Sequence, residues 1–298
     1  MIEISYNLSG KIDPVLVDIL RIINQEATSR GMLFFVVGAT ARDIVFNHCH
    51  AVRTYRQTRD LDIGVDVAGW DEFRQLSDAL ISTGKFAADR EPYRLFYGRF
   101  PVDIVPYGGV SPDNQTISWP PDYQMVMSIM GFQEAYDYGI TVRLSDDPVL
   151  DVKVPTIPGM VMMKLISWND RYPARPKDAE DLLFLMNNYA EAGNLDRMYD
   201  DEVELLQSED FDQTLAGIRL LGRDLASVKT KATGEVIRTI LATETNEQGR
   251  LRLVQDMAQG ARLHDRTDEL INKLKKLHQG FTEKRQGMPI TRTTPPFA

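Results

Sequence analysis

Three aspartates give this sequence its clearest chemical signal. Asp60 and Asp62 stand two residues apart in the segment DLDIGVDV, and Asp103 follows later in VDIV. In an extended strand, residues two apart point to the same side, so Asp60 and Asp62 would present neighbouring carboxylates. Such a pair repels itself unless a cation compensates it, and Mg²⁺ and Mn²⁺ prefer carboxylate oxygen. Asp103 on a neighbouring strand would complete a three-carboxylate metal site.

A purely structural interpretation of these aspartates stands beside the metal site. The DLD segment can be an exposed strand face, and Asp103 a charge at the edge of a sheet. Asp103 is flanked by Val102 and Ile104, however, so it lies in an otherwise apolar strand. An unpaired carboxylate is costly in such a place, and this context favours the metal site.

A glycine at the end of an apolar run is the second candidate feature. The run MLFFVVG predicts a buried strand that enters a turn, and ATARDIVFNHC has the spacing of a helix. The free N–H groups at the start of such a helix, together with the Thr40 hydroxyl, can hold phosphate oxygens. An ordinary capped turn fits the same junction.

The elements that must position these residues form an α+β pattern. Residues 14–30 have the apolar spacing of an amphipathic helix, DLDIGVDV alternates as a strand does, and RLFYGRFPVDIVPYGG predicts a hairpin. WDEFRQLSDALISTG predicts a helix that ends at Gly84. After residue 150 nearly every segment has helical spacing. We therefore expect a catalytic sheet domain over residues 1–150, a helical domain over 151–284 and a flexible basic tail over 285–298.

Composition sets further bounds on the function. The chain has 298 residues, of which 43% are hydrophobic and 26% charged, as in ordinary globular proteins. The single cysteine, Cys49, excludes an internal disulfide. No apolar run is long enough to span a bilayer, so we expect a cytoplasmic protein without a membrane partner. The net charge of -9 argues against coating of long nucleic acid, but not against a local basic patch that holds an anion or an RNA end.

Together the motifs resemble the nucleotidyltransferase superfamily of DNA polymerase β type. The superfamily pattern appears here as Val37-Gly38, Asp60-Leu-Asp62 and Asp103, with Ala39 in place of the usual second Gly or Ser. The stretch from Gly38 to Asp43 is similar to that of tRNA CCA-adding enzymes and poly(A) polymerases. Two later segments, KLISWNDR from Lys164 and KDAEDL from Lys177, resemble motifs of AbiEii-type toxins of type IV toxin-antitoxin systems.

The resemblance implies a fold, a reaction and a set of site residues. The fold would be a nucleotidyltransferase-type mixed sheet with flanking helices, followed by a helical domain. Two Mg²⁺ or Mn²⁺ ions on the carboxylates would hold an NTP such as ATP, and Asp103 would help to activate an acceptor hydroxyl, with release of pyrophosphate. The implied catalytic residues are Asp60, Asp62, Asp103 and Lys164, of which the three aspartates bind metal. The implied nucleotide-binding residues are Gly38, Ala39, Thr40, Arg42, Arg59, Lys177, Asp178 and Asp181.

The acceptor and the partners stay open at this stage. Likeness to the toxins favours RNA, for instance a tRNA 3′ end, and a cognate antitoxin as a protein partner. Nucleotidylation of a protein or of a small molecule fits the acidic composition equally well. The alternative of another class is a catalytically silent module that keeps the fold and binds a partner.

Overall fold

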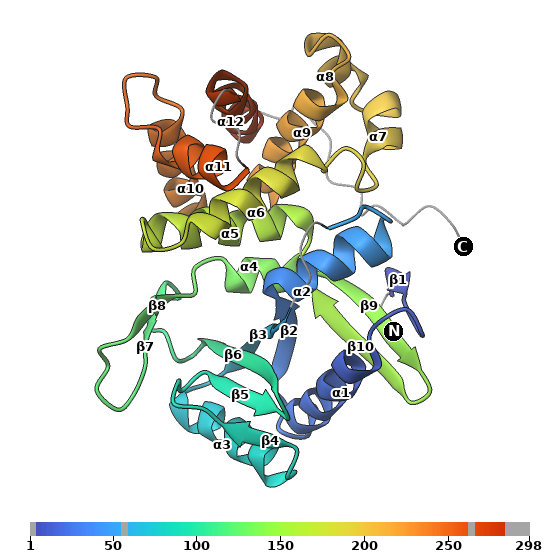
Figure 1. Ribbon diagram of the computed structural model, residues 1–298, viewed down its shortest axis with the longest axis vertical. Helices are drawn as coiled ribbons and strands as arrows, with labels where there is room; N and C mark the ends of the chain where they lie inside the picture. The colour runs from blue at the N-terminus through green and yellow to red at the C-terminus, as the bar shows by residue number, and fades with distance from the viewer. Residues whose placement is uncertain (1–3, 55–58, 262–265, 284–298) are drawn as a thin grey trace. The chain divides into compact units, whose positions relative to one another are not determined.

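A computed structural model describes residues 4–54, 59–261 and 266–283, and it divides the chain into two compact units (Figure 1). The first unit extends to Thr156 and the second begins at Ile157. The expected boundary after residue 150 falls inside strand β10 (Val149–Val154), which pairs with β9 (Ile140–Asp146) along its whole length. The tail expected over residues 285–298 lies outside the described residues.

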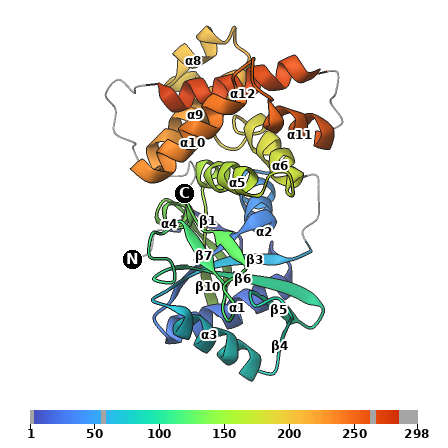
Figure 2. The ribbon, with the colours of Figure 1, turned by 90° about the vertical axis from the view of Figure 1, so that its left-hand side faces the viewer.

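The first unit is built on a mixed five-stranded sheet in the order β2-β3-β6-β5-β4 (Figure 2). β3 and β6 run parallel, and the other neighbours pair antiparallel. The unit is therefore α+β, as the sequence predicts. The strands are β2 (Leu33–Val37), β3 (Leu61–Val67), β4 (Phe86–Ala88), β5 (Arg94–Tyr97) and β6 (Phe100–Gly108).

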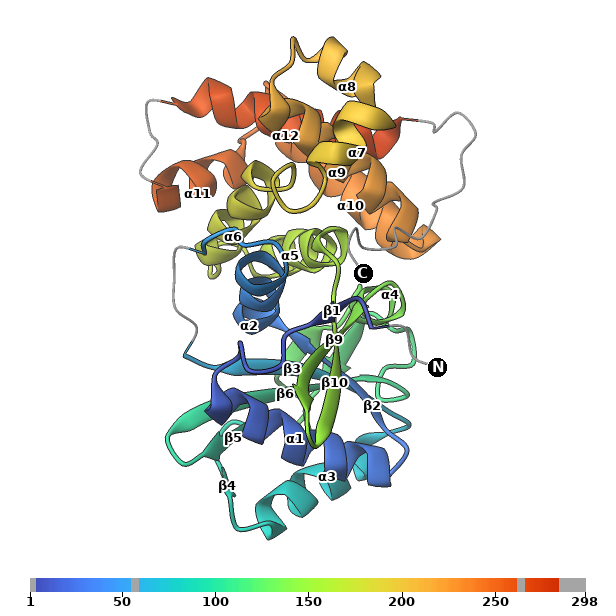
Figure 3. The ribbon, with the colours of Figure 1, turned by 90° about the vertical axis from the view of Figure 1, so that its right-hand side faces the viewer.

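One face of this sheet is covered by α1 (Pro14–Ser29) and α3 (Trp70–Ser82), which lie side by side in Figure 3. The Asp13 carboxylate accepts a hydrogen bond of 2.8 Å from the backbone N–H of Val15, and Pro14 occupies the first turn, where its missing N–H costs nothing. On the predicted apolar side of α1, Ile19, Leu20 and Ile23 are fully buried and Leu16 is partly exposed. Burial of this side, rather than helix propensity, stabilises α1.

Aromatic rings fill part of the opposite face. The Phe35 ring meets Tyr107 and Phe132 edge-on, with centroids 5.7 and 5.9 Å apart. Gly64 lies beneath them in β3, where an added Cβ would meet the rings of Phe35 and Phe132. The missing side chain therefore lets the aromatic rings pack directly against the middle of β3.

Two smaller sheets and two helical segments complete the first unit. β9 joins β10 and the short β1 in a three-stranded sheet, and β7 pairs with β8 in a hairpin. The predicted helix after Gly38 forms as an α-helical turn that continues as a π-helix. The bounds are β1 (Tyr6–Asn7), α2 (Gly38–Asp43), η1 (Ile44–Cys49), β7 (Thr116–Ser118), β8 (Val126–Ser128) and α4 (Phe132–Asp137).

The second unit is helical throughout its described residues, as predicted. α9 and α12 pack closely where Gly222 of α9 meets Gly280 of α12, because side chains at these positions would strike the partner's backbone. No helix among the described residues combines the length and the apolar character needed to cross a membrane. The helices are α5 (Ile157–Arg171), α6 (Pro176–Asn187), α7 (Leu195–Asp200), α8 (Val203–Ser208), α9 (Gln213–Val228), α10 (Lys231–Glu244), α11 (Arg252–Ala261) and α12 (Thr267–Thr282).

The α9–α12 crossing yields a stability prediction for Gly280→Ala. The new Cβ would meet the backbone carbonyl of Arg219 and lie 3.1 Å from the amide nitrogen of Arg223, and neither atom can rotate away. We expect a loss of about 1–3 kcal/mol in unfolding free energy, measured by urea denaturation with circular dichroism. In the control Gly234→Ala the obstructing atom is Lys229 Cδ at 2.6 Å, which belongs to a flexible side chain. The control should be neutral or stabilised, and equal stability of the two variants would contradict the prediction.

Candidate functional site

A row of register partners crosses the central sheet at the start of β3. Asp62 pairs with Val37 of β2 on one side and with Asp103 of β6 on the other. Asp103 pairs in turn with Arg94 of β5. Register partners on neighbouring strands point to the same face, so Asp62, Asp103 and Arg94 stand side by side on one surface of the sheet. We call these three residues the charged row.

The Arg94 guanidinium forms a bidentate ion pair with the Asp103 carboxylate. Nε lies 2.6 Å from one carboxylate oxygen and the second terminal nitrogen 2.7 Å from the other. These hydrogen bonds raise the pKa of Arg94 above its ordinary value, although burial opposes the shift. The Asp103 side chain is 13% exposed and that of Arg94 is 31% exposed. Asp103 is therefore a paired carboxylate, because the Arg94 guanidinium accompanies it.

Asp60 differs from Asp62 in its position. It lies just before β3, so the alternation of a strand does not set the direction of its side chain. Its backbone carbonyl instead accepts a hydrogen bond of 3.0 Å from the Thr40 hydroxyl. Thr40 is only 4% exposed. Its hydroxyl therefore ties the start of α2 to the aspartate segment, and its expected contact with phosphate stays a prediction.

Gly38 brings the start of α2 against the carboxylate of Asp62. The glycine has a φ of 66°, and an added Cβ would collide with the Asp62 carboxylate. Both the left-handed conformation and the close approach require the absence of a side chain. The glycine of the predicted strand-to-helix junction and the second aspartate of DLD are thus in direct contact.

The other residues predicted to bind nucleotide around this junction occupy different environments. Ala39 follows Gly38 in α2 and is partly exposed, and Arg59 is exposed next to Asp60. Arg42 is 3% exposed and donates to the Asp43 carboxylate over 3.0 and 3.2 Å. Arg59 is therefore the more accessible cation of the two, and the roles of all three stay predictions.

A preformed cluster of metal ligands is not found in the part of the chain that the structure describes. No group of three or more His, Cys, Asp or Glu side chains there is arranged to hold a metal ion. Asp62 and Asp103 share a face, but both oxygens of Asp103 are taken by Arg94. The oxygen donors suit Mg²⁺ or Mn²⁺ in type, and Asp62 and Asp103 supply two carboxylates on one face, of which Asp103 is paired with Arg94.

In the second unit, Lys164 of α5 lies between two aspartates of α6. Its ammonium is 2.8 Å from Asp178 and 2.7 Å from Asp181, and the Ser167 hydroxyl donates to Asp178 over 2.9 Å. Burial alone would lower the pKa of Lys164, but the two carboxylates outweigh it and raise the pKa. The Asp178 and Asp181 side chains are 5% and 6% exposed. Two of the three ammonium donors are thus used inside the unit, while the neighbouring Lys177 is exposed.

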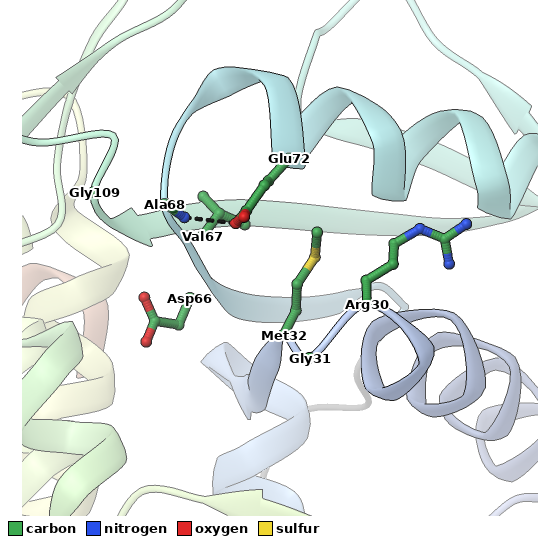
Figure 4. A pocket seen from close by; sticks show the side chains of 8 residues that line it. All are labelled: Arg30, Gly31, Met32, Asp66, Val67, Ala68, Glu72 and Gly109. Atoms are coloured by element: carbon green, nitrogen blue, oxygen red, sulfur yellow. Dashed lines mark hydrogen bonds between the residues drawn. The ribbon is translucent and has the colours of Figure 1, made fainter.

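A pocket in the first unit lies at the other end of β3 from Asp62 (Figure 4). Asp66 and Glu72 line it, and the Glu72 carboxylate accepts a hydrogen bond of 2.7 Å from the backbone N–H of Ala68. Burial, with the charges of Asp137 and Glu72, raises the pKa of Asp66. None of the residues predicted to bind metal or nucleotide lines this pocket.

The free thiol of Cys49 does not add a nucleophile to the site. Its burial raises the pKa to about 12, although Lys11 acts in the opposite direction. A thiol with such a pKa is protonated at neutral pH and therefore a weak nucleophile. This agrees with a structural thiol, the interpretation that the lone cysteine favours.

Comparison with known families decides what class of protein this is. The family described as "Nucleotidyl transferase AbiEii toxin, Type IV TA system" matches residues 28–273. The chain belongs to the AbiEii family. The match includes the charged row, the Gly38 junction and the Lys164 cluster. The resemblance drawn from the motifs is thereby confirmed.

Solved structures similar to this AbiEii protein are also nucleotidyltransferases, at low similarity. ANT(2'')-Ia in complex with adenylyl-2''-tobramycin aligns at 13% identity over 65% of this chain and 96% of that chain, with a TM-score of 0.35. A CCA-adding enzyme with ATP aligns at 15% identity over 93% and 69%, also with a TM-score of 0.35. No curated protein matches the chain. Scores this low do not establish a shared substrate.

The Lys164 cluster of this AbiEii protein yields a second stability prediction. Lys164→Met would leave Asp178 and Asp181 buried without their shared cation, at a cost of about 3 kcal/mol in unfolding free energy near pH 7. Because the pKa of Lys164 is raised above 10.5, its contribution is complete below that pH and is lost as the pH rises through the folded value. The gap between variant and wild type should therefore persist at neutral pH and close in strongly alkaline solution.

Thermal denaturation across this pH range tests the Lys164 prediction. The matched control is Lys177→Met, which removes the same charge from an exposed position of α6 and should change stability by less than about 0.5 kcal/mol. Equal effects of the two substitutions would contradict the account of the cluster.

Proposed function

We propose that this AbiEii-family protein transfers an NMP from an NTP to an acceptor hydroxyl at the charged row. The observation that carries the proposal is the pairing of Asp62 with Asp103 on one face, with Gly38 pressed against Asp62. Two adjacent carboxylates can bind cations, and the start of the neighbouring helix can bind phosphate. Membership of a nucleotidyltransferase family supports the reaction.

A divalent cation is part of the proposal, and the donors suit it. The oxygens of Asp60, Asp62 and Asp103 would hold Mg²⁺ or Mn²⁺, and the bound ions would neutralise the phosphates and favour attack at the α-phosphorus. Both oxygens of Asp103 accept hydrogen bonds from Arg94, so a cation that takes the place of the guanidinium would release it from this carboxylate.

The remaining steps belong to side chains and backbone of the chain itself. In the transfer, the acceptor oxygen forms a bond to the α-phosphorus while the bond to pyrophosphate breaks, and Asp103 accepts the hydroxyl proton. The N–H groups of Gly38 and Ala39 would hold phosphate oxygens at the start of α2. Arg59, which is exposed, is better suited to contact the triphosphate than Arg42, which is buried. Lys164 would act mainly by holding Asp178 and Asp181 in place.

The proposed acceptor is RNA, in particular a tRNA 3′ end, with a cognate antitoxin as protein partner and the cytoplasm as location. The family description as a toxin of a type IV system supports the antitoxin partner. The likeness of the motifs to those of the toxins favours RNA over a protein or small-molecule acceptor. A silent partner-binding module is the second candidate. The Arg94–Asp103 pair favours it in one respect, because a carboxylate compensated by arginine needs no metal for stability.

Asp62→Asn tests the reaction and separates it from the silent module. With Mg²⁺ and NTPs radiolabelled at the α-phosphate, the wild type should label an acceptor, and the variant should lose at least about 100-fold in rate because a carboxylate of the charged row is gone. The matched control, Asp66→Asn, changes the same residue type on the same face of β3. Because the pKa of Asp66 is raised, its charged form is disfavoured, so the control should stay active and at least as stable. Equal activity of both variants would refute the role of Asp62.

The acceptor is identified by which polymer carries the label. We expect label in tRNA when total cellular RNA and protein are offered together, and none in the protein fraction. Binding of tRNA in a gel shift should weaken steeply with salt, because phosphate contacts release counterions. Label confined to protein, or to a small molecule, would overturn the RNA assignment and leave the transfer reaction standing.

A further inference from the structure

We propose that Arg94 is an internal counterion that competes with a divalent cation for Asp103. This rests on the proposed function, which places metal on the same carboxylate. The guanidinium engages both oxygens of Asp103, at 2.6 and 2.7 Å. A metal ion that takes the place of the guanidinium on these oxygens must displace Arg94. Arg94 is thus a positioning residue of the charged row, acting through Asp103.

The charged row contains two carboxylates that repel each other. Asp62 and Asp103 are direct partners on parallel strands, so two carboxylates stand on adjacent strands of one sheet face. Like charges directly opposite each other destabilise a sheet. Arg94 offsets one of them with a bidentate pair, the strongest form of side-chain ion pair. The row therefore holds together without metal.

Arg94 and Asp103 differ in how far their side chains are exposed to solvent. Asp103 is 13% exposed and Arg94 is 31% exposed, so the guanidinium side faces solvent more than the carboxylate does. A long arginine side chain can swing away, whereas a short aspartate is fixed to its strand. Exchange of Arg94 for a cation is therefore a side-chain movement that leaves the pairing of β5 with β6 intact.

The Arg94–Asp103 pair affects how tightly a cation can bind to Asp103. A cation that takes the place of Arg94 must first break two charge-assisted hydrogen bonds, which weakens its apparent affinity. Removal of Arg94 should strengthen metal binding and weaken the metal-free fold. A purely structural arginine would show only the second effect.

Binding of Mn²⁺ alone, measured by calorimetry with no nucleotide present, tests the proposal. We expect Arg94→Gln to bind Mn²⁺ about tenfold more tightly than the wild type, which corresponds to about 1.4 kcal/mol. Arg99→Gln is the matched control. Arg99 lies in the turn of the same β5–β6 hairpin and is exposed, so its loss reports only the general effect of one less positive charge.

Two further variants locate the effect. The gain of Arg94→Gln should vanish when Asp103→Asn is added, because the contested carboxylate is then absent. Arg94→Lys keeps the charge but loses the bidentate geometry, so it should fold and bind Mn²⁺ with intermediate affinity. The proposal is overturned if Arg94→Gln and Arg99→Gln bind equally, if the gain persists without Asp103, or if Arg94→Lys binds like the wild type.

The binding measurement is independent of catalysis. If Mn²⁺ affinities follow the expected order but no NTP is incorporated, the proposed function fails and the competition stands. If the protein transfers NMP but substitution of Arg94 leaves the Mn²⁺ affinity unchanged, the proposed function stands and the competition is refuted. Absence of Mn²⁺ binding in every variant also refutes it.

Discussion

The repulsion between Asp62 and Asp103 is the constraint on which the first unit depends. Their strands pair parallel and in register, so the two carboxylates cannot turn to opposite faces without a shift of the sheet. A cation must therefore accompany them. Arg94 supplies one from the next strand, and Gly38 lets the start of α2, with its exposed N–H groups, approach the other carboxylate. The sheet register, the hairpin and the glycine turn all serve the same electrostatic requirement.

In the helical unit, too, a basic side chain compensates neighbouring carboxylates. Asp178 and Asp181 lie one turn apart on α6, and both are buried. Lys164 on α5 reaches both, so one ammonium compensates two carboxylates and fixes the packing of the two helices. The sequence motif that spaces these residues thus has a structural explanation that is complete within the unit. Any contact of Lys164 with a nucleotide that keeps this arrangement would have to use the third ammonium donor.

The sequence predicted those elements in which one period dominates. The helix from Pro14, the strand before Gly38, the DLDIGVDV strand and the β5–β6 hairpin all form, since their apolar residues recur at helical or strand spacing. It did not predict the three-stranded sheet of β1, β9 and β10, because β1 contributes only two residues and pairs with a strand far along the chain. Nor could strand alternation place Asp60, which lies one residue outside β3.

The partner of Asp103 was nevertheless within reach of the sequence. Gly98 and Arg99 form a two-residue turn between β5 and β6, and Gly98 has a φ of 60°, as such turns require. A turn of that length fixes the register, so counting outward from it pairs Arg94 with Asp103. The acidic residues alone indicate carboxylate ligands for a metal ion. They do not indicate that Arg94 stands beside Asp103. In a sheet, the register that gathers carboxylates also determines which basic side chain stands next to them, and that neighbour decides whether the site must have metal in order to fold.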